Sequence, residues 1–400
     1  MEGWKLLLVF ILVMALLMRR APLGPVMVGG SVLLAALYRT SPGALLGMVW
    51  RATRNPTTVE LVAILTSIMI LEHFLGHEGY LKKMLEGLQG LFRDRRVVMA
   101  IIPAFIGLMP SAGGAIFSAP LVSKAADGGA IAAEEKSFVN YYYRHIWEYF
   151  LPLYPGVLLA SRLSGLPLPH LIAALAPYGL LVILLGLPAL RRIPPLTEEA
   201  RDAGGRWTRA KEVFAGTWPI LLVLGLVLVA KVEVGLAVGA VLVALLVRHR
   251  YTLSKVGQLC RQAISVKTLL LVWGIMIFKQ VLEDTRAVES LPPLLAKLPV
   301  PEFALFGFLS FLVGMLMGLM AAFVGITFPL IAASLGDRLT LPLVVFVFIA
   351  GFTGTMLSPL HLCLVLTVDF FKADMRKVFR MLLGPEAALM AFALAAYLFR

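Results

Sequence analysis

Apolar runs long enough to cross a lipid bilayer recur along the whole of this sequence, and they constrain its fold more than any other feature. A helix needs about 20 mostly apolar residues to cross about 30 Å of hydrocarbon. Hydrophobic residues make up 60% of the chain and charged residues 15%, whereas soluble domains contain about 45–50% and about 25%. The pattern predicts an all-α polytopic membrane protein with no separate soluble domain.

About ten transmembrane helices are expected, near residues 4–18, 22–38, 57–75, 144–162, 170–190, 217–231, 233–247, 264–282, 341–361 and 384–399. Two further apolar stretches, 97–126 and 303–335, are longer than one helix needs and contain Pro, Gly and small polar residues in the middle. Irregular backbone at membrane depth is tolerated only where protein or a cavity surrounds it. Each stretch therefore predicts a re-entrant hairpin, which enters and leaves on one side of the membrane.

The charges of the short loops predict an orientation and exclude one class of partner. The net charge is +13, but the basic residues are spread among loops instead of forming one face, so no nucleic-acid partner is expected. Most Lys and Arg residues fall on the side that carries the connections 76–96, 191–216 and 369–381. By the positive-inside rule this side is cytoplasmic. Both termini and the connection 39–56 are then expected outside, in a protein of the inner (plasma) membrane.

An internal repeat divides the chain into two halves. Ile68-Met69-Ile70 recurs as Ile275-Met276-Ile277, and Leu151-Pro152-Leu153 aligns with Ser358-Pro359-Leu360 at the same spacing of 207 residues. The expected units are 1–190, a cytoplasmic linker 191–216, and 217–400. Each unit crosses the membrane five times, so the second is inverted relative to the first, as in elevator-type secondary transporters.

The tips of the two hairpins are candidate binding segments. The first tip contains Ser111, Gly113 and Gly114 beside a proline, a run that leaves backbone groups free and lets a solute approach the main chain. A packing kink is the alternative. The second tip, expected at 321–327, is less polar and carries Thr327 as a candidate ion-coupling residue.

Each half also contains a helix that proline and polar residues interrupt. The helix at 341–368 carries hydroxyl groups and a histidine, at Thr353, Thr355, Ser358 and His361. Unwound segments of this kind bind cations through oxygens and anions through the N-termini of half-helices. The alternative is that each hydroxyl bonds back to its own helix. We expect Thr353, Thr355 and Ser358 to bind solute and His361 to take part in ion coupling.

The first interrupted helix, 138–162, carries Asn140, Arg144 and Glu148 just before two prolines. Arg144 and Glu148 are four residues apart and can pair on one helix face. Ionisable residues within a membrane are costly and therefore indicate function. We expect Asn140 and Arg144 to bind solute and Glu148 to couple an ion; the alternative places all three at the cytoplasmic interface.

The order of elements in the two halves resembles the ion transporter superfamily of secondary carriers. Within it, Pro110-Ser111-Ala112-Gly113-Gly114, Asn140-Tyr141-Tyr142-Tyr143-Arg144-His145 and Met356-Leu357-Ser358-Pro359-Leu360-His361 look most like a membrane family called domain of unknown function 401. The resemblance covers essentially the whole chain. It implies that solute and coupling ion bind at the first tip and at Thr353, Thr355 and Ser358. The Ser-Asn-Thr signature of Na⁺-coupled dicarboxylate carriers is absent, which leaves protons and Na⁺ both open.

The predicted function is secondary active transport of a small, anionic solute, coupled to a proton or sodium gradient. A channel and a flippase for a lipid-linked solute stay open as alternatives, since re-entrant segments also line pores. No hydrolase, metalloprotease or P-loop motif is present, so no enzyme activity and no cofactor are expected. Cys260 and Cys363 lie about a hundred residues apart in apolar surroundings and predict neither a disulfide nor a metal site. A homodimer in the lipid bilayer is expected.

Overall fold

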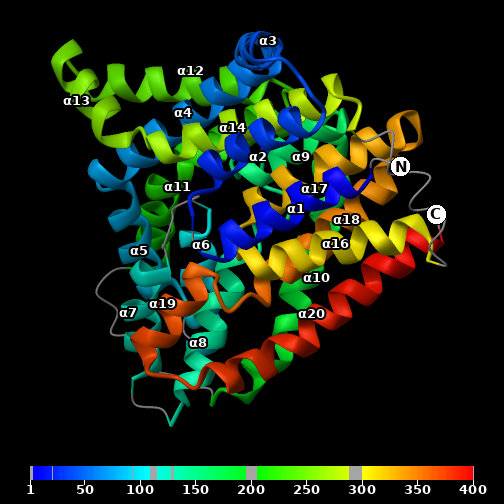
Figure 1. Cartoon of the computed structure of the whole chain (residues 1–400). Helices are drawn as coiled ribbons and strands as arrows, with labels where there is room; N and C mark the ends of the chain where they lie inside the picture. Colours follow the sequence, from blue (N-terminus) through cyan, green and yellow to red (C-terminus); the bar gives the residue numbers. More distant parts are fainter. Residues whose placement is uncertain are drawn as a thin grey trace.

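The computed structural model describes residues 3–19, 21–92, 94–108, 115–127, 130–194, 205–287 and 300–399. All regular elements within these ranges are helices (Figure 1). The first half of the chain forms α1 (Gly3–Met18), α2 (Leu23–Leu37), α3 (Pro42–Arg54), α4 (Pro56–His77), α5 (Tyr80–Leu91), α6 (Arg95–Ile106), α7 (Ala115–Ala126), α8 (Ala133–Tyr142), η1 (Tyr143–His145), α9 (Pro155–Ser164) and α10 (Leu168–Arg192). The expected all-α fold is confirmed.

The second half of the chain is also helical. It forms α11 (Arg206–Leu228), α12 (Val234–Arg248), α13 (Leu253–Ala263), α14 (Val266–Asp284), α16 (Glu302–Met317), α17 (Met320–Leu335), η3 (Gly336–Arg338), α18 (Leu341–Met356), α19 (Leu362–Phe371) and α20 (Met375–Leu398). Residues 288–299 lie outside the described part.

Five described helices are long and apolar enough to cross a membrane: Pro56–His77, Leu168–Arg192, Trp207–Leu228, Met320–Arg338 and Met375–Leu398. A sixth span results if α13 and α14, which meet at a bend of 63°, count as one. Shorter apolar helices include α1, α2, α12, α16, α18 and α19. The chain is therefore helical in its described residues, with five to six candidate membrane spans by length and composition, which is compatible with a membrane protein.

Three boundaries differ from those expected. The connection 39–56 contains a helix, α3, because Ser41 accepts a hydrogen bond from Ala44 N and caps it, and Pro42 suits its first turn. The last helix begins at Met375 and not near 384, because Asp374 caps it through Arg376 N. The linker expected at 191–216 is helical from Arg206 onward.

The second hairpin turns earlier than expected. Gly318 ends α16 with φ of 60°, a left-handed conformation that glycine adopts without strain, and α17 begins two residues later. The expected tip at 321–327, with Thr327, therefore lies inside helix α17. This correction arises because Ala321 to Thr327 contains no residue that must break a helix, whereas Gly318 supplies the turn.

The helices pack as two groups. The scaffold group consists of α1–α5 and α11–α14, in which α2 packs against α14, α5 against α11, and α4 against α12 and α13. The core group consists of α6–α10 and α16–α20, in which α18 packs against α16 and α20, and α9 against α17. Figure 1 draws α4, α12, α13 and α14 in its upper part and α8, α10, α19 and α20 in its lower part.

Helix α18 is the centre of the core group. Every residue from Leu343 to Met356 is buried, and α17 is buried along almost its whole length. A helix that is apolar on all sides and buried on all sides is surrounded by protein and not by water or lipid. The polar residues near the C-terminal end of α18, Thr353 and Thr355, therefore lie within the molecule.

Candidate functional site at the two helix breaks

The first break separates η1 from α9. Residues 146–154 form turns and bends, and α9 starts with Pro155 at its first position after the N-cap Tyr154. Proline lacks the N–H that would continue a helix and disfavours helical geometry in the residue before it, so Pro152 and Pro155 keep this segment open. The predicted interruption of the helix 138–162 is present.

The second break separates α18 from α19. Helix α18 ends at Met356, Pro359 lies in the break, and His361 is the N-cap of α19. The two breaks match locally: Tyr154 N donates to Leu151 O at 3.1 Å, and His361 N donates to Ser358 O at 3.2 Å. Both residues of the second bond lie 207 positions after those of the first. The interruption predicted for 341–368 is present as well.

Tyr141 joins the two breaks. Its hydroxyl group donates to the carbonyl of Met356, the last residue of α18, at 2.9 Å. The same hydroxyl oxygen lies 2.9 Å from Nδ1 of His361, which also lies 3.2 Å from Thr355 O. Because the only hydroxyl proton goes to Met356, Nδ1 of His361 is the donor in both contacts. The end of α18 and the start of α19 are thus held by a side chain of α8.

The hairpins reach both breaks. A Cβ atom at Gly107, the C-cap of α6, would collide with the carbonyl of Arg144, and one at Gly314 of α16 would collide with the carbonyl of Gly351. Gly314 lies 207 positions after Gly107, and Gly351 lies 207 positions after Arg144. At the turn of the second hairpin, a Cβ at Gly318 would lie 2.7 Å from His361 N. Only glycine allows these close approaches of backbone to backbone.

Arg144 and Glu148 form an ion pair inside the protein. Nη1 of Arg144 lies 3.4 Å from Oε1 of Glu148, and the exposed fractions of the two side chains are 2% and 11%. Glu72, a half-buried residue of α4 in the scaffold group, interacts electrostatically with Arg144. The predicted pairing of Arg144 with Glu148 is present in the structure, whereas the depth of this pair in the membrane stays a prediction.

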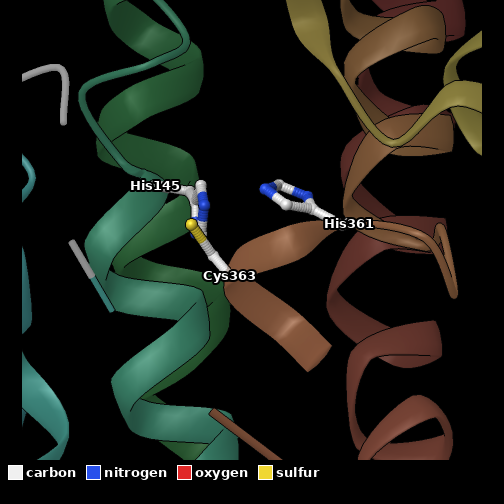
Figure 2. A group of neighbouring side chains, drawn as sticks. All are labelled: His145, His361 and Cys363. Carbon is white, nitrogen blue, oxygen red and sulfur yellow. The ribbon is translucent and has the colours of Figure 1, made fainter. Parts of the chain in front are cut away.

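His145 lies next to this pair. Its Nδ1 lies 2.6 Å from the carbonyl of Tyr141, and since a carbonyl can only accept, Nδ1 carries the proton. Nε2 is then an acceptor; it is fully buried, lies 3.7 Å from Oε1 of Glu148, and belongs to a ring that interacts with the thiol of Cys363. Figure 2 shows that it shares its surroundings with His361 and Cys363, which come from the second break.

Asn140 connects the first hairpin to the second half. Its side-chain amide donates to Ala115 O at 3.1 Å and to the hydroxyl of Thr367 in α19 at 3.0 Å. Its carbonyl oxygen is buried and has no partner among the described residues. Ala115 begins α7 and directly follows the first tip. The predicted residues Ser111, Gly113 and Gly114 of that tip lie outside the described residues.

The predicted hydroxyl groups differ in their surroundings. Thr353 is buried, and its hydroxyl interacts with the carboxyl group of Glu386 in α20. Thr355 bonds back to Gly351 O at 3.1 Å, as the alternative interpretation of such residues predicted, and Ser358 accepts from Leu360 N at 3.2 Å. Thr327 does not join this group: its hydroxyl donates to Phe323 O and accepts from Ser310, within the hairpin of α16 and α17.

Glu386 is a buried acid that the sequence did not single out. It lies on the inner face of α20 with no exposed surface, and the hydroxyl of Thr353 is the hydrogen-bonding side-chain group that its carboxyl group interacts with. Its polar neighbours are Thr353 of α18 and the tyrosines Tyr142 and Tyr149. The expected span 384–399 placed Glu386 at a helix end; with α20 starting at Met375 it lies in mid-helix, where an acid is a strong functional signal.

A family model described as "Protein of unknown function (DUF401)" matches residues 4–399. No curated protein matches the chain.

Proposed function

We propose that this chain, which belongs to the family described as protein of unknown function (DUF401), is a secondary active transporter of a small anionic solute, driven by a proton or sodium gradient. One observation carries the proposal: both halves of the chain contain an interrupted helix, and the two breaks meet in the buried interior, where a hairpin contacts each of them. Binding sites of secondary transporters are formed in this way from discontinuous helices.

The finer architecture that we propose is two inverted repeats with ten crossings and two re-entrant hairpins. Helix contacts support it because each helix of the first half corresponds to the helix whose label is ten higher. The contact of α2 with α14 then corresponds to that of α12 with α4, and the contact of α9 with α17 to that of α19 with α7. The contact of α8 with α19 corresponds in the same way to that of α18 with α9. The glycine contacts and the N-caps at equal spacing support it independently. An odd number of crossings in each half would invert the second.

An anionic solute fits the charge of the junction. The N-termini of α9 and α19, which begin after Tyr154 and His361, each carry a partial positive charge from the helix dipole. Arg144 adds a full positive charge between them and has Glu148 as a partner that a solute could replace. We therefore assign Arg144 and Asn140 to solute binding, together with Thr353 and Ser358.

Coupling requires a group that binds a cation in one state and releases it in another. Glu148 and Glu386 are the two acids buried in the core group near the breaks. A carboxylate without a positive partner is very costly at this depth, so Glu386 must hold either a proton or a cation. The hydroxyls of Thr353, which interacts with this carboxyl group, and of Tyr149 could complete an oxygen site for Na⁺.

The contact between the two groups of helices suits movement of the core group against the scaffold group. A crevice lined only by apolar side chains lies between α1, α2 and α14 on one side and α17 on the other, with Phe10, Phe278 and Ile326 in its wall. The ion pair of Glu60 in α4 with Arg162 in α9 is a polar contact across this boundary. Because the boundary between the two groups is mostly apolar, the core group could slide along the scaffold group while breaking few hydrogen bonds or ion pairs.

Transport by the purified protein in liposomes tests the proposal. A thermal-shift screen of mono- and dicarboxylates, sugar acids and phosphate compounds, with and without Na⁺, first identifies a ligand, since a bound solute stabilises by mass action. Counterflow of that solute is then measured. A carrier saturates and supports counterflow, a channel passes solute without either property, and a flippase moves only labelled lipid-linked compounds. Absence of counterflow for every stabilising ligand would contradict the proposal.

A further inference from the structure

We infer that His145, His361 and Cys363 form a binding site for a borderline-soft divalent transition-metal ion, of which Zn²⁺ is the first candidate. All three residues are buried, and one nitrogen from each histidine together with Sγ of the cysteine lie within 4.8 Å of one another (Figure 2). Imidazole and thiolate are the ligands that such ions prefer, whereas Mg²⁺ and Ca²⁺ prefer oxygen. The site is distinct from the oxygen groups around Glu386.

The tautomers of both histidines are set for coordination. The Nδ1–H of His145 donates to the carbonyl of Tyr141, and the Nδ1–H of His361 donates to the hydroxyl of Tyr141 and to Thr355 O. Each ring therefore presents Nε2 with its lone pair. A metal-bound histidine nearly always donates its other N–H to a carbonyl or carboxylate in this way, which fixes the ring and strengthens the ligand. Tyr141 serves both rings.

The buried nitrogen of His145 is a second observation that favours a ligand. Nε2 of His145 is completely buried and has no hydrogen bond of ordinary geometry, and the ring interacts with the thiol of Cys363. A metal ion would replace the thiol proton and bind both the nitrogen and the sulfur. Oε1 of Glu148, at 3.7 Å from this nitrogen, is within reach as a fourth ligand.

Distances and charges are compatible with a metal ion. Tetrahedral Zn²⁺ with ordinary bond lengths holds its ligand atoms roughly 3.3–3.6 Å apart. The three atoms here need to approach by about 1 Å, which small side-chain rotations provide. Thiolate and carboxylate together balance the two charges of the ion. Arg144, which interacts electrostatically with Cys363, adds a positive charge that the two anionic ligands offset in part.

The ligands come from both interrupted helices, so a bound ion would tie the breaks together. His145 lies at the end of η1, whereas His361 and Cys363 lie at the start of α19. We therefore expect Zn²⁺ to raise the melting temperature of the protein. This inference does not depend on transport, because it concerns equilibrium binding alone.

The test uses the full chain, purified in detergent, freed of metal by chelation and of any affinity tag. Titration with Co²⁺ should produce a thiolate-to-cobalt charge-transfer band with a stoichiometry of about one, and Zn²⁺ should displace it. Cys363→Ser should lose the band, and Cys260→Ser, the matched control on α13, should keep it. Tyr141→Phe should keep the band but weaken affinity by about 10–100-fold, as loss of a supporting hydrogen bond does.

A measurement on the unchanged chain protects the test against misfolded variants. X-ray absorption at the zinc edge should show one sulfur at about 2.3 Å and nitrogen or oxygen at about 2.0–2.1 Å. A spectrum without sulfur, no retained zinc after desalting, or loss of the cobalt band in Cys260→Ser instead of Cys363→Ser overturns the proposal.

Discussion

Arg144 and Glu148 matter at the residue scale because their burial makes each depend on the other. Removing one member of a buried pair typically costs about 3–5 kcal/mol, whereas a surface pair contributes about 0–1 kcal/mol. We predict that Glu148→Gln abolishes accumulation driven by a pH gradient but spares solute exchange, and that Arg144→Gln abolishes both. Uptake and counterflow in liposomes from pH 5 to 8 measure the difference.

Glu302→Gln is the matched control for this prediction. Glu302 pairs with Arg338, but both side chains are largely exposed, at 42% and 60%. The control should therefore transport and melt like the parent. If Arg144→Gln and Glu148→Gln also behave like the parent, the pair has no role in transport, and coupling must be sought at Glu386.

Glu386 gives a second prediction at this scale. In Glu386→Gln a neutral amide of the same size replaces the buried carboxyl group beside Thr353. Since the amide carries no charge and cannot release a proton or bind a cation as the carboxyl group can, we expect the variant to be about as stable as the parent but to lose gradient-driven accumulation. If the coupling ion is Na⁺, adding NaCl in place of KCl should raise the melting temperature of the parent and not of the variant. A variant that still accumulates solute would remove Glu386 from the mechanism.

Single residues show where sequence reasoning succeeds and where it stops. Arg144, Glu148 and His361 were predicted because charged or polar residues in an apolar run attract attention. Cys363 was assigned no function because a cysteine in an apolar helix usually packs as a small hydrophobe. Its neighbour His145 lies more than two hundred residues earlier in the chain, so only the tertiary fold brings the two together.

Proline and glycine at particular positions explain which elements could be predicted. The two interruptions contain Pro152, Pro155 and Pro359, whose rings disfavour a continuous helix. The short helices α3 and α13 were missed because neither is apolar enough to resemble a span, and their caps are local hydrogen bonds. The turn of the second hairpin was placed too late because a single glycine, Gly318, sets it.

Close packing of α16 on α18 gives a prediction at the scale of elements. In Gly314→Ala the new methyl group would collide with the carbonyl of Gly351, so the two helices must separate. Overpacking of this kind costs about 1–3 kcal/mol, and we expect a lower melting temperature together with reduced transport.

Gly239→Ala in α12 is the control for this prediction: nothing lies within 4 Å of a Cβ added at position 239. It should be neutral or slightly stabilising, because Ala favours a helix. Equal melting temperatures for the two variants would contradict the close approach of α16 to α18.

The junction of α4 with the segment after α12 gives a prediction on pH. Glu78 follows the end of α4, and the hydrogen bond from the Tyr251 hydroxyl is the main cause that lowers the pKa of its carboxyl group below 4.5. A lowered pKa stabilises the fold above the unfolded value, and this contribution is lost as the pH falls through the folded value. We expect Tyr251→Phe to lower the free energy of unfolding at pH 7 by roughly 1 kcal/mol and therefore to lower the melting temperature. The difference from the parent should shrink below pH 4.5; a constant difference would place the effect in packing instead.

At the scale of the whole molecule, the repeat is what made the order of helices predictable. A spacing of 207 residues in the sequence returns in the fold as matching contacts at Gly107 and Gly314 and matching N-caps at Tyr154 and His361. The grouping into scaffold and core could not be derived in the same way. It depends on which helices of one half pack against the other half, such as α2 on α14, and apolar faces in a membrane protein do not specify their partners.

Membrane orientation is the last prediction, and it concerns the whole molecule. Figure 1 draws α5, α7 and α13 toward one side of the picture and both chain ends toward the other. The basic loops belong to the first side, so we propose that it is cytoplasmic.

In a Cys260→Ser background, a membrane-impermeant maleimide added to intact cells should label Gly43→Cys and not Lys82→Cys. Both positions are exposed, and the Cβ added at position 43 meets no other atom within 4 Å. After the cells are opened, Lys82→Cys should be labelled too, and the background protein, whose remaining Cys363 is buried, should stay unlabelled. Labelling of Lys82→Cys alone in intact cells would reverse the orientation; labelling of both there would place the two loops on one side and contradict the proposed five crossings in each half.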